Sequence, residues 1–361
     1  SGGGEAREAP LQDRVAEAVV RRFDELPGRG KPQGSAWTVL AGIVAEEPDL
    51  PLRVLSLATG TRCIGVAAMT AGRGRAVHDC HAEVLCRRAF HRFLFRELEA
   101  GGKDAGSILE REGATTWRVR PGVRLHFYVS TLPCGECTMV PISSTAEGTL
   151  GRKCLGQEEQ ARAGPTPLRD RNRTGAKPST GMPEDPKATG IGFHCGGILR
   201  YKSGRSDTKP ECRSVCYSCS EKLCRWNHTG WQGALLARLI PQPLTMASVV
   251  IGGPLFDEGF VREALFDRAG SPSPGVARPA FLQTSVPFHS SREVLEEPRG
   301  DPVQAKISTA GLSVVWCSPC GPETAPAPRS ISRAVPGFYD VLIGHTGERQ
   351  GLRADRRKAA G

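Results

Sequence analysis

Apolar side chains recur every four residues near the start of the chain, at Leu11, Val15, Val19 and Phe23, with charged residues between them. This spacing places them on one face of a helix, and the Pro-Gly pair that follows ends the helix. Residues 81–99 show the same periodicity, with apolar positions at i, i+3 and i+4 before a Gly-Gly pair. The pattern therefore predicts two amphipathic helices.

Strict alternation of apolar and polar residues over 123–129 predicts a strand that runs into Pro133 and Cys134. A helix that begins there would direct its first free N–H groups at whatever Cys134 binds. The remaining predicted elements are strands over 54–58, 63–67, 248–251 and 313–316, a turn over 59–62, and helices over 37–44 and 230–240. We expect residues 268–302 to be irregular.

The predicted helices and strands alternate along the chain, and this order is typical of a layered α/β fold with helices against a sheet. One stretch interrupts the pattern. Residues 156–190 are rich in Pro, Gly, Thr and charged residues and have hardly any apolar side chains. We interpret this stretch as a flexible insertion rather than a domain, because it has too little apolar surface to form a core.

Composition narrows the function classes. Of the 361 residues, 39% are hydrophobic, but no apolar run reaches the roughly 18 residues that a membrane span needs. Lys and Arg exceed Asp and Glu by 10, which fits either a well solvated surface or a polyanionic partner such as nucleic acid. Thirteen cysteines are an odd number in a chain without a visible export signal. We therefore expect an intracellular protein, nuclear or cytoplasmic, in which thiols bind metal.

The first candidate catalytic motif is His81-Ala82-Glu83, at the start of a predicted helix. Such a tripeptide arises often by chance, and alone it indicates no more than a solvated His and Glu. About fifty residues later, Cys134 and Cys137 form a Pro-Cys-x-x-Cys motif after a strand. Together the two motifs match the zinc deaminase signature, in which three protein ligands leave the fourth zinc position open for water.

Several cysteine pairs compete for the metal. The C-x-x-C spacing occurs three times, at 134–137, 216–219 and 317–320. Two such pairs could instead close a structural four-thiolate zinc site, although 78 residues separate Cys137 from Cys216, far more than in a zinc ribbon. Spacing alone does not decide whether Cys137 or Cys219 is the third ligand.

Longer motifs carry a resemblance to a known family. They are DCHAEVLCRR (79–88), PCGE (133–136), SCSEKLCRWN (218–227) and GWQGALL (230–236). They resemble the catalytic domain of adenosine deaminases acting on RNA, whose fold is a layered, cytidine-deaminase-like α/β sheet flanked by helices. The resemblance implies zinc held by His81, Cys134 and Cys219, with Glu83 as the catalytic residue that moves protons.

Within that family, GKP (30–32), WTVLA (37–41) and RTGAK (173–177) resemble the branch that deaminates the adenosine at position 37 of alanine tRNA, next to the anticodon. The resemblance implies alanine tRNA as the partner, and deamination of double-stranded RNA or inactive RNA binding as the alternatives. It divides the chain into an N-terminal helical segment (1–29), a catalytic domain (30–351) and a C-terminal end (352–361) that we expect to be truncated relative to the family.

The family also buries inositol hexakisphosphate behind its active site. Five residues match positions that hold this cofactor, namely Arg87, Arg88, Lys222, Arg225 and Trp226. The forked guanidinium groups among them suit phosphate. The resemblance further implies a polar relay of Asp79 and Lys222 that links the zinc-binding cysteine to this cofactor.

Two further residues, Thr61 and Arg62, resemble family positions near the flipped nucleotide, although an ordinary hairpin turn explains them equally well. The chain also departs from the family at several points. Glu136 and Glu221 stand where Asp is usual, Leu132 stands where Thr is usual, and residues 209–216 look like an insertion before Cys219.

Overall fold

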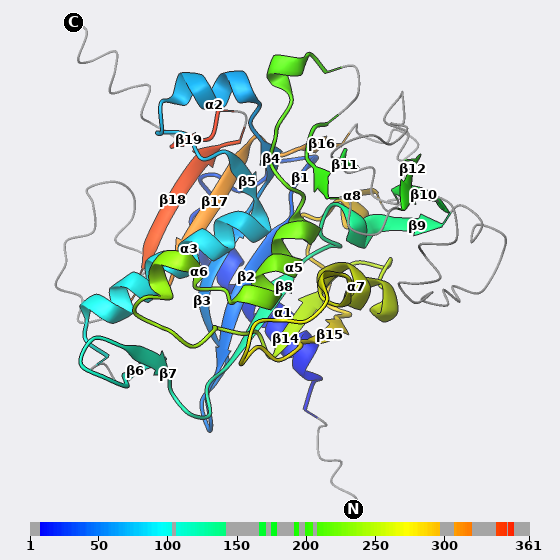
Figure 1. Ribbon diagram of the computed structural model, residues 1–361. Helices are drawn as coiled ribbons and strands as arrows, with labels where there is room; N and C mark the ends of the chain where they lie inside the picture. Colours follow the sequence, from blue (N-terminus) through cyan, green and yellow to red (C-terminus); the bar gives the residue numbers. More distant parts are fainter. Residues whose placement is uncertain are drawn as a thin grey trace, which may run out of the picture.

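The computed structural model describes residues 8–102, 106–141, 166–170, 175–178, 191–194, 199–204, 208–296, 307–319, 337–344 and 346–349. Its centre is an eight-stranded sheet with the strand order β15-β14-β8-β2-β3-β17-β18-β19 (Figure 1). The β8-β14-β15 end of the sheet is parallel, and the other pairings are antiparallel. The predicted layered α/β class is therefore confirmed. No helix of the described residues is long and apolar enough to cross a membrane.

The strands of the central sheet vary from two to seven residues in length. In chain order they are β2 (Leu40–Glu46), β3 (Arg53–Thr59), β8 (Arg124–Val129), β14 (Ser248–Ile251), β15 (Ala280–Gln283), β17 (Leu312–Cys317), β18 (Phe338–Ile343) and β19 (Glu348–Arg349). The two longest helices are α1 (Leu11–Glu25) and α3 (Ala82–Glu99). Both amphipathic helices were predicted, as were strands at the positions of β3, β8, β14 and β17.

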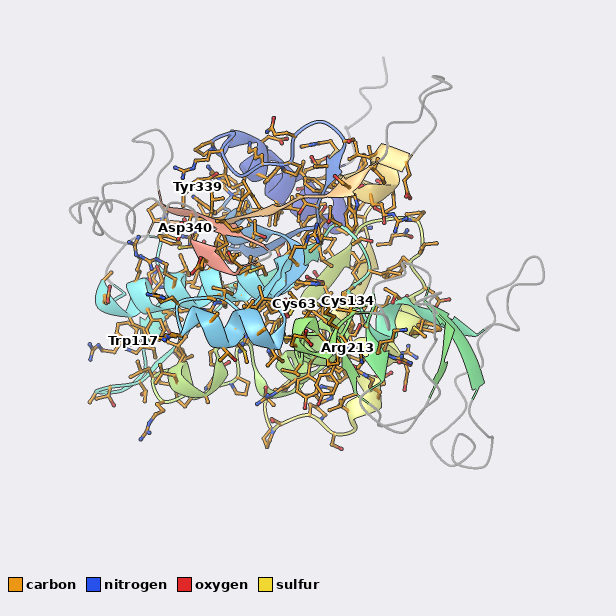
Figure 2. All side chains as sticks on the ribbon, turned by 90° about the horizontal axis from the view of Figure 1, so that it is seen from above. Cys63, Trp117, Cys134, Arg213, Tyr339 and Asp340 are labelled. Atoms are coloured by element: carbon orange, nitrogen blue, oxygen red, sulfur yellow. The ribbon has the colours of Figure 1, made fainter. Side chains whose placement is uncertain are left out.

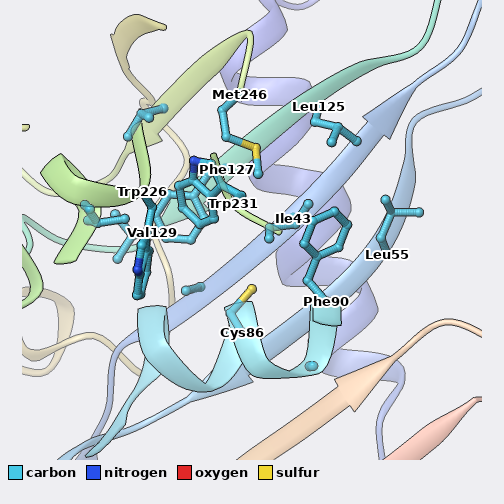
Figure 3. Close-up of a cluster of buried hydrophobic side chains, with 14 of the residues drawn as sticks. Ile43, Leu55, Cys86, Phe90, Leu125, Phe127, Val129, Trp226, Trp231 and Met246 are labelled. Atoms are coloured by element: carbon cyan, nitrogen blue, oxygen red, sulfur yellow. The ribbon is translucent and has the colours of Figure 1, made fainter. Parts of the chain in front are cut away.

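Helices α1 and α3 lie on opposite sides of the sheet (Figure 2). Successive residues of β2 divide between the two layers: Ile43 packs in the cluster under α3, while Leu40 and Val44 pack in the cluster under α1. The α3 side of the core is filled by large side chains that include Phe90, Leu125, Phe127, Trp231 and Met246 (Figure 3). This packing fixes α3, whose first turn carries the candidate catalytic residues, against the sheet.

Shorter elements surround the sheet. They are β1 (Ala36–Trp37), β4 (Thr61–Cys63), α2 (Val66–Gly72), β5 (Asp79–His81), β6 (Leu109–Arg111), β7 (Trp117–Val119), β9 (Met139–Pro141), β10 (Thr166–Asp170), β11 (Lys177–Pro178), β12 (Ile191–His194), β13 (Arg200–Tyr201), α5 (Cys219–Thr229), α6 (Gly233–Leu236), α7 (Glu258–Leu265), α8 (Arg292–Glu296) and β16 (Ser308–Thr309). Single 3₁₀ turns cover Glu136–Thr138 (η1), Pro210–Cys212 (η3) and Asp267–Ala269 (η4).

The helix predicted over residues 37–44 is wrong, because this segment forms the end of β1 and most of β2. All of Leu40–Ala45 is buried, since helices cover both faces of the sheet at this strand. A strand buried on both faces loses its polar–apolar alternation, and a continuous apolar run does not distinguish it from a buried helix.

Other predicted elements are only partly correct. The strand expected over 63–67 lies earlier, as β4, and helix α2 begins at Val66. The helix expected over 230–240 is reduced to the four residues of α6, and the helix expected after Pro133 is the single turn η1. The region 268–302 is not wholly irregular, because it contains β15 and α8. Most of the predicted insertion (156–190) lies outside the described residues, and its described part includes β10 and β11.

Candidate active site

Two candidate site residues come from the junction of β5 with α3. His81 is the last residue of β5 and the N-cap of α3, and Glu83 lies in the first helical turn. The backbone N–H of His81 donates to Asp79 Oδ1 at 3.0 Å, which holds the end of the strand. Strand β4 pairs with β5 so that Thr61 lies opposite His81. The hairpin and the helix start therefore bring three of the predicted site residues to one place.

Cys134 follows β8 in a tight turn that contacts the start of α5. The turn depends on Gly135, which has φ 105° and where a Cβ would lie 2.1 Å from Ser218 Oγ. Ser220 Oγ donates to the Cys134 carbonyl at 2.9 Å and accepts from the Cys137 N–H at 3.0 Å. These contacts lock the Pro-Cys-Gly turn against the helix that carries Cys219, and only glycine permits so close an approach.

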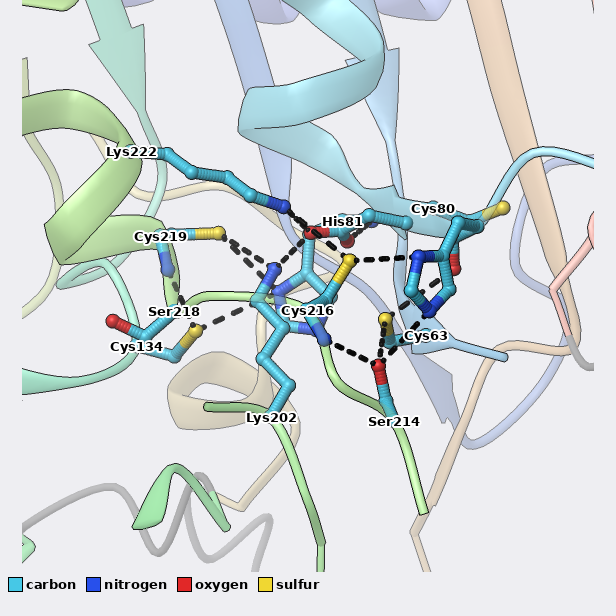
Figure 4. A network of polar contacts seen from close by, with 12 residues as sticks. Cys63, Cys80, His81, Cys134, Lys202, Ser214, Cys216, Ser218, Cys219 and Lys222 are labelled. Atoms are coloured by element: carbon cyan, nitrogen blue, oxygen red, sulfur yellow. Dashed lines mark hydrogen bonds and ion pairs between the residues drawn. The ribbon is translucent and has the colours of Figure 1, made fainter. Parts of the chain in front are cut away.

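His81, Cys134 and Cys219 form a compact cluster, with one ligand atom from each lying within 4.8 Å of the others (Figure 4). His81 Nδ1 is 3.9 Å from Cys134 Sγ and 3.6 Å from Cys219 Sγ. Both sulfur atoms are buried. One imidazole and two thiolates form a donor set that zinc prefers, so the residues fit this metal.

Cys137 does not join this cluster, although spacing made it an equal candidate. Its backbone is held by Ser220, and it belongs to neither Cys/His group of the described residues. Burial raises the pKa of the Cys137 thiol. Within the cluster, the hydrogen bond from Cys219 holds the pKa of Cys134 well below its ordinary range, while burial raises the pKa of Cys219.

Glu83 lies beside the cluster with its carboxyl group buried. Its Oε2 atom has no hydrogen-bond partner among the described residues, and burial raises the pKa of the carboxyl group. Both His81 and Glu83 line a cavity of about 390 Å³. A buried carboxyl group that keeps a free oxygen in a cavity can exchange protons with a molecule bound there.

Thr61 also lines the cavity, and its buried hydroxyl oxygen likewise has no hydrogen-bond partner in the part of the chain that the structure describes. Further lining residues are Trp37, Thr38, Val39, Ser130, Thr131, Leu132, Cys134, Leu255, Ser291, Arg292, Glu293, Glu296 and Thr309. Arg62 is placed differently: its side chain is exposed and donates to the Thr309 carbonyl at 3.5 Å rather than lining the cavity. The structure therefore places Thr61 inside the cavity and Arg62 outside it.

A buried charge relay lies behind the metal cluster. Lys202 Nζ is 2.6 Å from Asp79 Oδ2 and 3.1 Å from Cys219 Sγ, and Lys222 Nζ donates to the same carboxylate oxygen (Figure 4). Burial by itself would favour the neutral acid, but Lys202, His81 and Lys222 hold the pKa of Asp79 well below its usual range. The relay therefore keeps a negative charge at Asp79 and a cation against one candidate ligand.

Three of the predicted polyphosphate residues lie together. The Arg87 guanidinium is 4.5 Å from the centre of the Trp226 ring, and Arg87 Nε donates to the Trp231 carbonyl at 2.9 Å. Burial, followed by the charge of Arg225, lowers the pKa of Arg87 to about 10. The structure thus keeps a largely buried guanidinium next to a second cation.

The other two predicted residues point to different neighbours. Arg88 lines a second cavity, of about 650 Å³, between α3 and the strands β17 and β18, together with Arg92 and Arg96. Lys222 faces Asp79 and Cys216. The five residues therefore lie on the first half of α3 and on α5, but they do not form one compact cluster.

Several site residues were missed by sequence analysis. Lys202 lies on a short segment next to a low-complexity region, where nothing in the sequence distinguishes it from a surface lysine. Glu293 Oε1 accepts from the Thr131 hydroxyl at 3.0 Å, and Glu293 belongs to the region expected to be irregular. The substituted acids have partners as well: Arg200 pairs with Glu136, and Arg268 pairs with Glu221.

Comparison with known proteins agrees with this geometry. Residues 56–326 match the adenosine-deaminase (editase) domain, and the chain belongs to this family. The structure and the match together define a deaminase enzyme.

Two kinds of named relative are similar to the chain. Human tRNA-specific adenosine deaminase 1 is 26% identical over 84% of this chain and 79% of its own length. The protein of the same name from Drosophila melanogaster is 34% identical over 66% of this chain and 55% of its own length. Mouse double-stranded RNA-specific adenosine deaminase is 31% identical over 71% of this chain but only 20% of its own length.

Proposed function

We propose that this chain catalyses the hydrolytic deamination of adenosine to inosine in tRNA. The observation that carries the proposal is the unpartnered Glu83 Oε2 in a cavity whose wall also includes His81 and Cys134 of the Cys/His cluster. The tRNA substrate is supported by the relatives named for it, which align with most of this chain.

The reaction needs an activated water and a group that moves protons. His81, Cys134 and Cys219 would hold zinc, which when bound would lower the pKa of water at its open position toward about 7. Glu83 takes one proton of the attacking water and delivers it to N1 of adenine as the water oxygen adds to C6. It then takes the second proton from the new C6 hydroxyl and passes it to the amino group, which leaves as ammonia. Water and adenosine thus yield inosine and ammonia.

The substrate base must leave its stack to enter the cavity. We propose the adenosine on the 3′ side of the anticodon of alanine tRNA, because a loop base is already unpaired and costs little to turn outward. Thr61 would offer its unpartnered hydroxyl to the flipped nucleotide, and Arg62 would meet the RNA outside the cavity. An RNA substrate and ten unpaired cysteines among the described residues both fit an intracellular location, nuclear or cytoplasmic.

The test is the Glu83→Gln variant, with Glu17→Gln on the exposed face of α1 as the matched control. The amide of Gln keeps the shape of the side chain but cannot accept a proton from water. We expect Glu83→Gln to bind zinc and tRNA normally and to lose at least a hundredfold in inosine formation, measured by sequencing alanine tRNA after incubation. Activity within tenfold of the parent would remove Glu83 from this role.

Double-stranded RNA is the second candidate substrate, because relatives named for it are about as similar over the shared domain. The same assay separates the candidates when both RNAs are offered at equal concentration. We expect inosine in the tRNA. Inosine only in the duplex would favour the alternative, and RNA binding without any inosine would indicate an inactive relative.

We further propose that Arg87, Arg88, Lys222, Arg225 and Trp226 hold inositol hexakisphosphate. The support is the cationic region formed by α3 and α5, where the half-buried Arg87 lies beside the exposed Arg225. Burying a cation next to another cation opposes folding, and a bound polyanion relieves both the desolvation and the repulsion. Added stability would reach about 4 kcal/mol at a thousandfold excess over Kd.

The test compares Arg87→Ala with Arg21→Ala, which changes an exposed arginine on α1. We expect denatured parent protein to release the polyphosphate, measured by mass spectrometry, and added inositol hexakisphosphate to raise the melting temperature of the parent and of Arg21→Ala. Arg87→Ala should melt lower and respond weakly. No released polyphosphate and an unchanged melt in the parent would contradict the proposal.

A further inference from the structure

A second group of potential metal ligands lies next to the catalytic cluster and shares no residue with it. Cys63, His78 and Cys216 each offer one ligand atom, and the three atoms lie within 4.8 Å of one another. The side chains of Cys63 and Cys216 point toward each other from different segments (Figure 4). Cys63 ends strand β4, His78 precedes strand β5, and Cys216 lies in the segment before α5.

The spacing of these atoms suits a small ion. His78 Nδ1 is 3.3 Å from Cys216 Sγ, and ligand atoms of a tetrahedral zinc site are roughly 3.3 to 3.8 Å apart for bonds of about 2.0 to 2.3 Å. An oxygen is close by as well. Ser214 Oγ lies 2.9 Å from Cys63 Sγ and 3.4 Å from His78 Nε2, the ring nitrogen that does not face Cys216, so its hydroxyl can orient the imidazole.

We propose that Cys63, His78 and Cys216 bind a second zinc ion, distinct from the metal of the His81–Cys134–Cys219 cluster, with water as the fourth ligand. Two thiolates and an imidazole are soft donors that select zinc over magnesium or calcium. All three side chains are partly buried, so a bound ion is shielded from exchange.

A neighbouring lysine favours the thiolate form of one cysteine, which is the form that binds a metal ion. Lys222 Nζ lies 3.6 Å from Cys216 Sγ and favours its thiolate form. The same ammonium group pairs with Asp79, which adjoins His78 in sequence. Two thiolates neutralise the charge of one zinc ion. Lys222 then no longer needs to compensate the Cys216 thiolate and keeps its ion pair with Asp79.

A zinc ion here would fasten two parts of the catalytic architecture. Cys63 and His78 flank the β4–β5 hairpin, which carries Thr61 and His81, whereas Cys216 lies three residues before Cys219. The Val66 N–H donates to the Arg213 carbonyl at 3.1 Å across this junction. The second zinc is thus a structural clamp that sets the position of α5 relative to the hairpin.

Metal analysis of the purified parent tests the proposal, and we expect two zinc ions per chain. Cys216→Ser and His78→Gln should each bind one, while Cys219→Ala should also bind one by losing the catalytic ion instead. Cys212→Ser is the matched control, because this exposed cysteine lies in the same segment but outside the cluster. It should retain both ions, as should Cys137→Ala.

A spectroscopic experiment tests whether both sites bind metal through thiolates. Cobalt(II) replaces zinc in thiolate sites and gives sulfur-to-metal charge-transfer bands, whose intensity rises with the number of bound thiolates. We expect the bands of the parent to fall by about half in Cys216→Ser and by about half in Cys219→Ala. This readout does not depend on deaminase activity, so it remains valid if the proposed function fails.

Specific outcomes would overturn the second site. One is a parent with a single zinc whose stoichiometry Cys216→Ser leaves unchanged. Another is a Cys63–Cys216 disulfide, found by peptide mass analysis, whose reduction allows no second ion to bind. Should a serine variant fail to fold, the parent still decides the matter, because titration with a zinc chelator must release two ions in separable steps.

Discussion

At the scale of single residues, the cavity is marked by two polar atoms that lack hydrogen-bond partners among the described residues. Glu83 Oε2 and Thr61 Oγ1 are buried and unpartnered, and both residues line the cavity. An unsatisfied buried polar atom costs roughly 1 to 3 kcal/mol. A fold tolerates this cost where a substrate or water completes the hydrogen bond, so these atoms indicate where the substrate binds.

His91 provides a residue-scale prediction about pH. Its Nε2–H donates to the Trp231 carbonyl at 2.8 Å, and burial followed by the charge of Arg87 lowers its pKa to about 4 from 6.5. Between these values the unfolded chain binds a proton that the folded chain refuses. Stability is therefore lost as pH falls from about 6.5 toward 4, by on the order of 3 kcal/mol for this group.

The measurement is the free energy of unfolding of the parent and of His91→Gln between pH 7.5 and 4.5. Glutamine can still donate to the Trp231 carbonyl but does not titrate in this range. We expect the variant to lose less stability on acidification than the parent. Parallel curves would show that His91 does not contribute to the acid sensitivity.

At the scale of elements, sequence periodicity predicted the amphipathic helices well, but it failed for a strand that is buried on both faces. Helices α1 and α3 each have one apolar face, and both were predicted close to their observed bounds. Strand β2 lies between the two helical layers and has no polar face, so its apolar run was mistaken for a helix. The error follows from burial, which removes the alternation that identifies a strand.

The contact between α1 and β2 yields an element-scale prediction. A Cβ at Gly42 would lie 2.6 Å from both methyl carbons of Val19, so the strand needs glycine to let the helix approach. We expect Gly42→Ala to destabilise the protein by about 1 to 3 kcal/mol, measured by denaturant unfolding, because the helix must shift or Val19 must adopt a strained rotamer.

The double variant Gly42→Ala/Val19→Ala controls for other effects of the substitution. Removing the two methyl groups of Val19 makes room for the new Cβ, so the double variant should lose less stability than the sum of the single variants. Strict additivity would mean that the two side chains do not compete for the same space.

Only those site residues that belong to short sequence motifs could be predicted. His81, Glu83 and Cys134 were found by spacing, and Cys219 needed the resemblance to a family. Lys202 was not found, since its role arises from contacts with Asp79 and Cys219 that only the fold creates. The Cys63–His78–Cys216 group likewise depends on three segments meeting in space, which no spacing rule reveals.

At the scale of the whole molecule, the candidate substrate site and helix α1 lie on different sides of the central sheet. Helix α1 packs on one face of the sheet, whereas the cavity, the metal cluster and α3 belong to the other side. The net charge of +10 attracts a polyanion at long range. Only cations near the cavity opening can contact bound RNA directly. Arg62, exposed on β4 next to Thr61, is such a cation.

This arrangement predicts how tRNA binding depends on salt. Each phosphate contact that is lost lowers the slope of log affinity against log salt by roughly 0.7 to 0.9, because fewer counterions are released. We expect the affinity of the parent for alanine tRNA to fall steeply with salt, and Arg62→Ala to weaken binding and reduce the slope by about 1. Arg21→Ala, on α1 and exposed on the far side of the sheet, should leave both values unchanged. Binding measured by fluorescence anisotropy at several salt concentrations makes the comparison. A flat plot for the parent would mean that phosphate contacts do not drive binding, and equal slopes for the parent and Arg62→Ala would place the RNA elsewhere on the surface.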